Sequence, residues 1–444
     1  MNYTPSSSSN DRSSEVQPYL VVKIEDRAEL RSGSLNYRDF LEYLPPDARP
    51  LDNDFIFVPQ YSDQTQNCLE NLVQKAQQDD PDYVGPNFAN YFLIEIASED
   101  RADRVLEILR SWPIVNFAHL HPGPVKPPTE TTIDPLAINQ AYLYPQPEGI
   151  DAIYAWTVKG GDGEGQRFAD VEWGWFQEHQ DLTEHSYTNI ADGFYDDVEH
   201  GTSVLGIIAA HVNQQQCQGI VHNVRHIVTV GQWRSPFIIV TAEAIANAIC
   251  ALDSGDVLLI EVQTVMYGHV NIALEAEPSV FDLVDLATRV GITVVAAAGN
   301  GAKNFDLIED DQGGPVFAQD SGGILVAAAE RMYPPHWTQT GFTCFGDRLD
   351  CFAQGTQVVT LTTYGDGTSQ TTSTFGGTSS ASAIVAGAAL SIQGVAEHCL
   401  GSKLSPAELR EFLTAPDLNT LPYSPAHKIG VMPNLRNIIE KLLN

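Results

Sequence analysis

Short apolar runs alternate with amphipathic stretches along most of the chain after residue 135. Continuous apolar runs without alternation are typical of strands in a parallel sheet that helices cover on both faces. Residues 241–253 and 279–290 carry helical patterns between such runs. Residues 136–444 are therefore predicted to form one α/β domain. Its predicted strands are RFADV (167–171), HIVTVG (226–231), VLLIEV (257–262), ITVVAAAG (292–299) and GILVAAA (323–329).

A shorter segment with strand and helix patterns of its own precedes this domain. Three runs predict strands because they are rich in β-branched and aromatic residues: YLVVKI (19–24), NYFLIEI (90–96) and IVNFAHL (114–120). Between the last two, apolar residues such as Val105 and Leu109 give one face to a helix that ends near Arg110. Residues 17–120 are therefore predicted to form a small α+β domain.

Two polar segments flank the small domain. The Ser-rich residues 1–16 are predicted to be a disordered tail. HPGPVKPPTETTIDP (121–135) carries five prolines, which favour an extended and semi-rigid chain. We interpret it as the linker between the two domains, and both a plain linker and a maturation cleavage site remain open.

Charge narrows the classes of partner. The 444 residues include 57 acidic and 24 basic side chains, a formal net charge of −33. The chain has no basic block, so nucleic acid and anionic membrane surfaces are not expected partners. No apolar stretch reaches the roughly 20 residues that span a bilayer. The first twenty residues lack the pattern of a secretory signal peptide, so a cytoplasmic location is expected.

The six cysteines are scattered and form no CxxC pair. In a chain of this length without a signal peptide, reduced thiols are the expected state. Cys344 and Cys351 are close enough in sequence to meet across a hairpin, so their redox state stays open. The spacing of the cysteines matches no zinc ligand set.

Four segments carry residues that suit chemistry, namely FADVEWGWFQEHQDL (168–182), EHGTSVLGIIAA (199–210), VVAAAGNGA (294–302) and FGGTSSASAIVAGAALSI (375–392). They place Asp170, His200, Asn300 and Ser379 at the end of a strand or the start of a helix. Each alone has a plain explanation as a turn or cap residue. Together they supply the nucleophile, base, orienting carboxylate and oxyanion donor that acyl transfer requires.

These segments resemble the motifs of the subtilisin-like serine peptidases (the subtilase family). The resemblance rests on HGTSVLG (200–206), GTSSASAIVAG (377–387), AAAGNGA (296–302) and ADVEWGWFQEHQDL (169–182), in the family's order, and covers roughly residues 150–440. It implies a three-layer domain and a serine endopeptidase that hydrolyses peptide bonds through an acyl-enzyme. By the resemblance, Ser379 is the nucleophile, His200 the general base and acid, and Asp170 the group that orients His200. Asn300 and the Ser379 N–H would then hold the oxyanion.

The sequence departs from the family's pattern in three places. Asp170 is followed by Val171-Glu172 where the family has Thr-Gly or Ser-Gly; Glu172 could bias the electrostatics, contact substrate or face solvent. Ala383 replaces the proline of the serine motif. Glu261 begins the segment that should line the substrate cleft, so it is expected near the S1 pocket, where it would favour a basic P1 residue.

The small domain resembles, more loosely, an inhibitor-type subtilase propeptide. This implies a latent enzyme in which the N-terminal domain is an intramolecular inhibitor, with autocleavage within 121–135. The segment 25–89 is longer than such a domain requires, and the sequence does not explain it. Subtilases often bind calcium, but no acidic loop can be assigned to it, so no cofactor or metal site is predicted.

Two alternatives remain beside a general endopeptidase. The same triad could serve a dedicated processing protease or a peptide macrocyclase, in which an amine resolves the acyl-enzyme. A pseudoprotease scaffold, with the N-terminal domain filling its cleft permanently, is the non-enzymatic alternative. In the first two cases the partner is a protein or peptide substrate.

Overall fold

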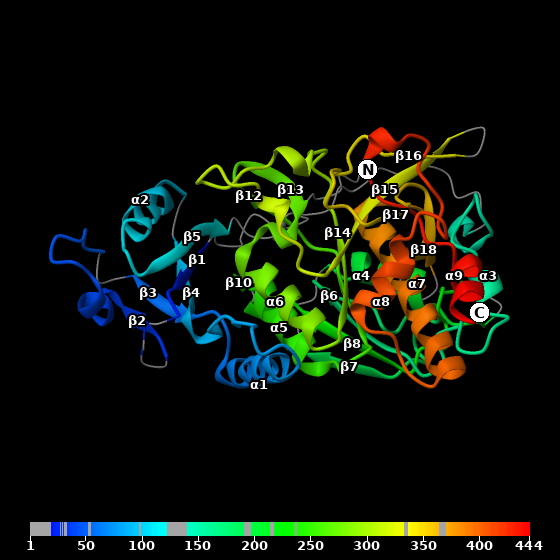
Figure 1. Cartoon of the computed structure of the whole chain (residues 1–444), viewed down its shortest axis with the longest axis horizontal. Helices are drawn as coiled ribbons and strands as arrows, with labels where there is room; N and C mark the ends of the chain where they lie inside the picture. Colours follow the sequence, from blue (N-terminus) through cyan, green and yellow to red (C-terminus); the bar gives the residue numbers. More distant parts are fainter. Residues whose placement is uncertain are drawn as a thin grey trace, which may run out of the picture. The chain divides into compact units, whose positions relative to one another are not determined.

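The computed structural model describes residues 19–26, 28, 30, 33–51, 55–96, 99–121, 140–190, 197–213, 217–235, 238–332, 336–363 and 370–444 (Figure 1). The predicted tail (1–16) and residues 122–135 of the predicted linker lie outside these residues. The chain divides into two compact units. The N-terminal unit takes described residues of 1–60, 90–126 and 234–239, and the large unit takes those of 61–89, 127–233 and 240–444. The division therefore differs from the predicted contiguous domains at 61–89 and 234–239.

An eight-stranded sheet lies at the centre of the large unit. Its order is β16-β15-β14-β11-β6-β8-β7, and β17 pairs with β15. Every pairing is parallel except that of β15 with β16. The strands are β6 (Arg167–Glu172), β7 (Tyr187–Ile190), β8 (His226–Gly231), β11 (Val257–Ile260), β14 (Thr293–Ala297), β15 (Ile324–Met332), β16 (His336–Gln339) and β17 (Cys351–Gln354). β6, β8, β11, β14 and β15 confirm the five strands that the sequence predicts.

Helices cover both faces of this sheet. Helix α5 (Thr241–Ala251) packs on β6 and β8, and α6 (Pro278–Arg289) packs on β14. Helix α4 (Glu199–Ala209) packs against α7 (Gly377–Leu400), and α7 covers β11, β14, β15 and β17. Figure 1 shows α5 and α6 on one side of the central strands and α7 on the other. The large unit is thus the expected three-layer α/β domain.

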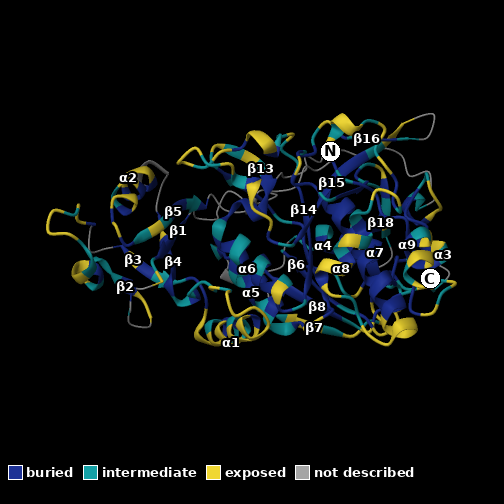
Figure 2. Cartoon of the chain, in the orientation of Figure 1, coloured by how far each residue is buried: buried dark blue, intermediate teal, exposed yellow. Residues whose placement is uncertain are grey.

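Burial explains why the central strands lack alternation. All side chains of β11 and β14 are buried, as expected for strands between two helical layers. Figure 2 shows the same burial along most of α7. Helix α7 is also long and apolar enough to cross a membrane by length and composition, but most of it is buried inside the fold.

Smaller elements complete the described structure. The two-stranded sheets β12–β13 and β18–β19 belong to the large unit. A third two-stranded sheet pairs β9 with β10, and residues 234–239 of these two strands group with the N-terminal unit. The bounds are β9 (Trp233–Ser235), β10 (Ile238–Ile239), β12 (Gln263–Met266), β13 (His269–Ala273), β18 (Val358–Thr362), β19 (Gln370–Phe375), α3 (Ala152–Ala155), α8 (Pro406–Thr414) and α9 (Leu435–Leu442).

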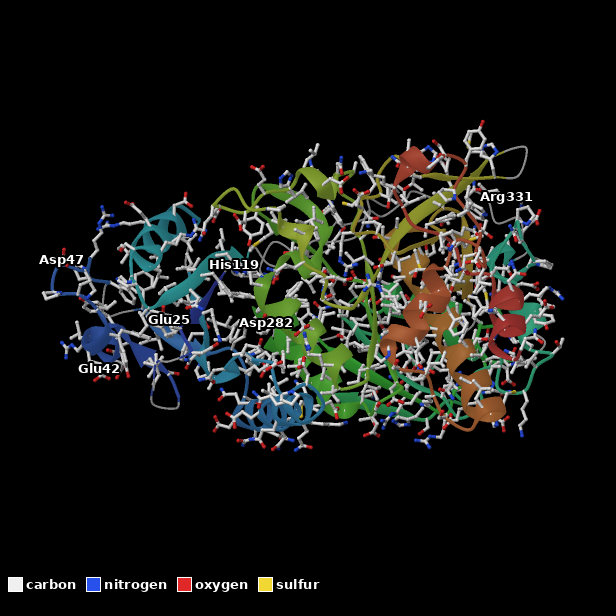
Figure 3. All side chains as sticks on the ribbon, in the orientation of Figure 1. Glu25, Glu42, Asp47, His119, Asp282 and Arg331 are labelled. Atoms are coloured by element: carbon white, nitrogen blue, oxygen red, sulfur yellow. A yellow bond between two sulfur atoms is a disulfide. The ribbon has the colours of Figure 1, made fainter. Side chains whose placement is uncertain are left out.

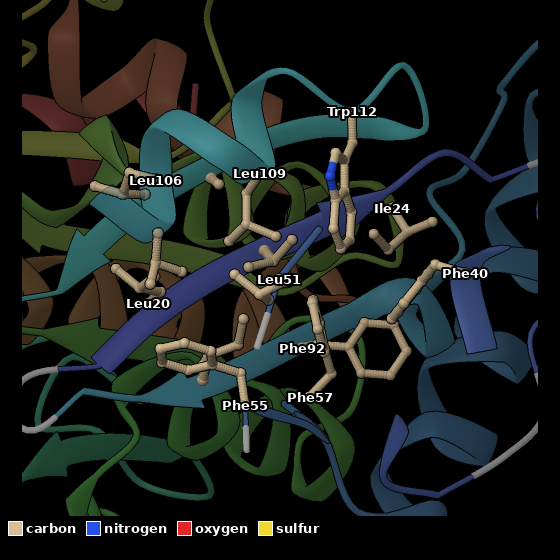
Figure 4. Close-up of a cluster of buried hydrophobic side chains, with 14 of the residues drawn as sticks. Leu20, Ile24, Phe40, Leu51, Phe55, Phe57, Phe92, Leu106, Leu109 and Trp112 are labelled. Atoms are coloured by element: carbon tan, nitrogen blue, oxygen red, sulfur yellow. The ribbon is translucent and has the colours of Figure 1, made fainter. Parts of the chain in front are cut away.

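The N-terminal unit is built on an antiparallel sheet of order β2-β3-β4-β1-β5. Helix α2 packs on β5. The aromatic residues Phe40, Phe57, Phe92 and Trp112 fill its core (Figure 4). The predicted strands at 19–24, 90–96 and 114–120 and the helix ending at Arg110 are confirmed. The elements are β1 (Tyr19–Ile24), β2 (Leu35–Asn36), β3 (Ile56–Pro59), β4 (Tyr91–Glu95), α2 (Glu99–Arg110) and β5 (Val115–His121).

Acidic side chains project from the surface of this unit. Figure 3 shows Glu42 and Asp47 pointing away from its sheet, and both residues are exposed.

Helix α1 (Asp63–Asp79) belongs to the large unit, although the chain on either side of it belongs to the N-terminal unit. Ser62 caps the helix, since its hydroxyl accepts from the Thr65 N–H at 3.2 Å. Its buried residues, which include Leu69 and Ala76, lie on one face, and the helix packs against α5 and α6. The sequence did not predict this helix.

The cysteines differ from the prediction of reduced thiols. Cys68 of α1 and Cys250 of α5 form a disulfide across 182 residues of sequence. Cys344 and Cys351 are free thiols and are buried. The hairpin disulfide that their spacing left open is therefore not formed in this structure.

Candidate active site

Ser379 lies in the first turn of α7, at one end of the buried helix. Gly377 begins that turn with φ +87°, a left-handed conformation that suits glycine. The first N–H groups of a helix have no acceptor within it, so the Ser379 N–H is available to an acceptor outside α7. A serine hydroxyl and a donor N–H thus come from the same residue.

Asn300 follows strand β14 and is held beside Ser379. Its Oδ1 accepts from the Thr378 N–H at 3.0 Å and from the Thr378 hydroxyl at 3.3 Å. The Asn300 N–H donates to Gln263 Oε1 at 3.0 Å. Because the amide oxygen is fixed on the residue before Ser379, the Asn300 NH₂ group is left to donate to another acceptor.

His200 is the second residue of α4. Its ring meets the ring of Phe375 edge-on, with centroids 5.4 Å apart. Phe375 is four residues before Ser379, and α4 packs against α7, so the fold brings His200 to the start of the serine helix. Gly201 permits the close approach of α4 to the preceding segment, since a Cβ there would lie 2.4 Å from the Gly174 carbonyl oxygen.

The carboxylate that pairs with His200 is Glu172, not Asp170. Nδ1 of His200 is hydrogen-bonded to Glu172 Oε1, and Glu172 Oε2 accepts from the Trp173 N–H at 3.3 Å. Asp170 instead accepts from the Trp175 indole N–H at 2.7 Å. The predicted role of Asp170 as the group that orients His200 is therefore wrong in this structure.

Strand geometry explains the correction. Residues two apart on a strand point to the same face, so Asp170 and Glu172 both face His200's side of β6. Glu172 is the last residue of β6, and Asp170 lies deeper in the sheet and is fully buried. The signal in the sequence was the position of Glu172 at the strand's carboxyl end, the edge where polar groups of parallel strands gather.

Carboxyl groups near His200 shift its pKa and the pKa values of one another. Burial lowers the pKa of His200, but the adjacent Glu172 and, further off, Asp170 and Asp197 outweigh it and raise the pKa above the ordinary value. Burial, then the charge of Glu172, raises the pKa of Asp170 to about 7. Burial and the neighbouring Asp170 also raise the pKa of Glu261.

Glu261 directly follows β11 and is buried. Its carboxyl group lies near those of Asp170 and Glu172. Its place near the S1 pocket and the preference for a basic P1 residue stay predictions.

The described part of the chain contains no cluster of three or more His, Cys, Asp or Glu side chains that could hold a metal ion. The groups that gather at the site are a serine, a histidine with a carboxylate on Nδ1, and an amide fixed beside the serine. These groups define a hydrolase of the serine–histidine–acid class.

The chain belongs to the subtilase family, whose model matches residues 174–420. The match includes His200, Asn300 and Ser379 and begins just after Glu172. Members of this family are serine endopeptidases, and this chain is one. No curated protein sequence matches it.

Solved structures share its fold at low sequence identity. Fervidolysin from Fervidobacterium pennivorans, a keratinolytic enzyme related to subtilisin, aligns with a TM-score of 0.55 and 14% identity, covering 96% of this chain and 61% of that chain. The MycP3 protease of the type VII (ESX-3) secretion system aligns with a TM-score of 0.50 and 20% identity, covering 69% of this chain and 89% of that chain. The protease domain of PatA aligns with a TM-score of 0.47 and 20% identity, covering 63% of this chain and 96% of that chain.

Proposed function

We propose that this endopeptidase works through an acyl-enzyme on Ser379, with Glu172 as the acid of its triad. The observation that carries the proposal is the Glu172–His200 hydrogen bond at the start of a helix packed against the serine helix. With Nδ1 donating to Glu172, Nε2 is the nitrogen that can accept the Ser379 proton.

The reaction follows from these positions. Ser379 Oγ bonds to the scissile carbonyl carbon while His200 Nε2 takes its proton, and Glu172 stabilises the imidazolium. The Asn300 NH₂ group and the Ser379 N–H donate to the oxyanion. His200 then protonates the amine as the C–N bond breaks. Water attacks the acyl-enzyme by the same route, releasing the acid and restoring Ser379.

Labelling with a fluorophosphonate tests this assignment. The intact mass of the wild-type protein should increase by one adduct, and Ser379→Ala should gain none. Ser382→Ala is the matched control, because Ser382 lies one turn further along the same helix and its hydroxyl only donates to the Ser379 carbonyl oxygen at 3.0 Å. An adduct on Ser379→Ala would contradict the proposal. So would the absence of an adduct on both the wild type and Ser382→Ala after cleavage within 121–135 and reduction of the Cys68–Cys250 disulfide.

We also propose that the N-terminal unit keeps the enzyme latent. Two facts support this: the unit has its own aromatic core, and residues 234–239, just beyond β8 of the catalytic sheet, group with it. Peptidase activity should rise after cleavage within 121–135, reduction of the Cys68–Cys250 disulfide and removal of the N-terminal piece. Equal activity before and after that removal would contradict latency. The processing-protease and macrocyclase alternatives and the cytoplasmic location stay predictions.

A further inference from the structure

Asp170, Glu172 and Glu261 are gathered on two neighbouring strands. β6 and β11 are parallel, and Asp170 pairs with Leu259, so Glu261 comes level with Glu172. All three side chains are buried: Asp170 is 0% exposed and the two glutamates are 6% exposed. Three buried negative charges on neighbouring strands cannot all persist, because His200 can compensate only one of them.

Hydrogen-bond partners show which pair holds the extra proton. Glu172 is satisfied by His200 and Trp173. Asp170 Oδ1 and both oxygens of Glu261 have no donor among the described residues, although the two carboxyl groups interact with each other. Two facing carboxyl groups without a donor are satisfied when one is protonated. The Trp175 N–H stabilises the anion of Asp170, so Glu261 is the group that carries the proton.

We propose that Asp170 and Glu261 share one proton and, through their charge, set the pH at which His200 becomes an active base. They are positioning residues, since they act on His200 and do not contact the reacting atoms. The inference rests on the proposed role of His200 in the reaction.

The direction of the effect follows from the charges that act on His200, which are Glu172 and Asp170 on β6 and Asp197 just before α4. Glu261, after β11, acts on Asp170 and Glu172. Below pH 7 Asp170 is increasingly protonated, and the pair becomes neutral. Above pH 7 Asp170 is ionised, and its charge favours the imidazolium and delays the loss of the His200 proton. Activity should therefore rise with pH later than an unperturbed histidine, with its pKa of about 6.5, would allow.

Two isosteric variants separate the charge of the pair from its packing. In Asp170→Asn/Glu261→Gln the pair stays neutral, so the acid limb of kcat/KM should move down by about one pH unit. In Glu261→Gln alone, the amide donates to Asp170 and keeps it ionised, so the limb should stay in place or move up. Glu277→Gln, which changes a buried carboxyl group bonded to Thr264, is the matched control and should leave the profile unchanged.

The same shifts can be measured without turnover. The ring protons of His200 can be titrated by NMR in a Ser379→Ala background, and their signal assigned by its loss in His200→Ala. A downward shift in the double variant, together with an unchanged or upward-shifted midpoint in Glu261→Gln, supports the proposal. An unchanged midpoint in the double variant, with or without a fall in kcat and stability, or a downward shift in Glu261→Gln, overturns it. If the midpoints shift but Ser379→Ala retains peptidase activity, the proposed function fails and the electrostatic inference stands.

Helix α1 independently carries a second inference. It is held on the large unit by the Cys68–Cys250 disulfide and by Thr65, whose hydroxyl donates to Asn247 at 2.8 Å. Asp80, just after the helix, pairs with Arg289 at 3.2 Å. The chain enters α1 from β3 and leaves it towards β4, and both strands belong to the N-terminal unit.

We infer that a cut within 121–135 leaves the N-terminal unit covalently attached to the large unit. An attached inhibitor acts at an effective concentration in the millimolar range, so dilution does not remove it. Both cysteines are half-buried and therefore open to a dithiol, which would reduce the disulfide to two thiols and itself become oxidised. Reduction would convert the tether into a contact that dilution can break.

A specific protease site inserted between residues 126 and 131 tests the tether, in a Ser379→Ala background that cannot cut itself. After cleavage, a denaturing gel without reductant should show one band, and with reductant two. Cys68→Ser should give two bands in both lanes, whereas Cys399→Ser, which removes an exposed free thiol, should behave like the parent. Two bands from the parent without reductant would overturn the inference.

Discussion

The replacement Glu172→Gln distinguishes the two carboxyl groups of β6. The Trp173 N–H, which now donates to Glu172 Oε2, would hold the carbonyl oxygen of the glutamine. Its NH₂ group would then face His200 Nδ1, which must become an acceptor. The ring proton would move to Nε2, the nitrogen that has to take the proton of Ser379.

The size of the loss follows from this wrong tautomer. An amide in place of the triad carboxylate costs about 10⁴-fold in kcat, or about 5.5 kcal/mol of transition-state stabilisation. Asp170→Asn leaves the Glu172–His200 bond intact and retains an acceptor for Trp175, so its rate on the pH plateau should fall less than tenfold. Glu172→Asp withdraws the carboxylate by about 1.5 Å, one bond length, and should cost about 10²-fold.

The assay is the rate of acylation by a peptide p-nitrophenyl ester, measured as the burst of nitrophenolate under single-turnover conditions after removal of the N-terminal unit. Thermal unfolding of each variant controls for misfolding. A larger loss for Asp170→Asn than for Glu172→Gln would refute the assignment of Glu172 and restore Asp170 as the triad acid.

Three further predictions follow from particular contacts. Asn300→Ala should lower kcat by about 10²- to 10³-fold with little change in KM, because it removes a donor used only by the oxyanion; steady-state kinetics measure this. Gly201→Ala should destabilise the large unit by about 1–3 kcal/mol, since its Cβ would clash with the Gly174 carbonyl, and a guanidinium titration with an unchanged midpoint would contradict this. Arg348→Ala should lower the free energy of unfolding by about 3–5 kcal/mol in the same titration. It leaves the buried Glu275 carboxylate without the guanidinium that it contacts at 2.9 Å.

The catalytic sheet could be predicted because its strands lie between two helical layers. Burial on both faces leaves continuous apolar runs, and VLLI of β11 is such a run. His200, Asn300 and Ser379 were predictable for a related reason. The pattern placed each of them at the end of a strand or the start of a helix, and parallel strand ends and helix starts meet at one edge.

The triad acid could not be chosen from the pattern. Asp170 and Glu172 share a face, so periodicity gives both the same orientation, and only their depth relative to His200 separates them. The side-chain length of glutamate matters as well, because the residue at the strand's end must still reach the imidazole.

Helix α1 left a weak signal for a different reason. Only Thr65, Leu69 and Ala76 of its seventeen residues are buried, so its apolar face is narrow. Its attachment depends on Cys250, which is 182 residues away in sequence, and no local spacing reveals such a pairing. The grouping of 61–89 with the large unit is therefore a property of the tertiary structure.

Trapping of the acyl-enzyme tests the central claim most directly. The protein, cut within 121–135 and reduced so that the N-terminal piece can dissociate, would be mixed with a peptide p-nitrophenyl ester, quenched in acid within milliseconds, and analysed by intact mass and peptide mapping. The account predicts one acyl group on Ser379 that disappears with time as free acid accumulates, and none on Ser379→Ala. An acyl group on another residue, or ester hydrolysis by Ser379→Ala at the wild-type rate, would contradict it.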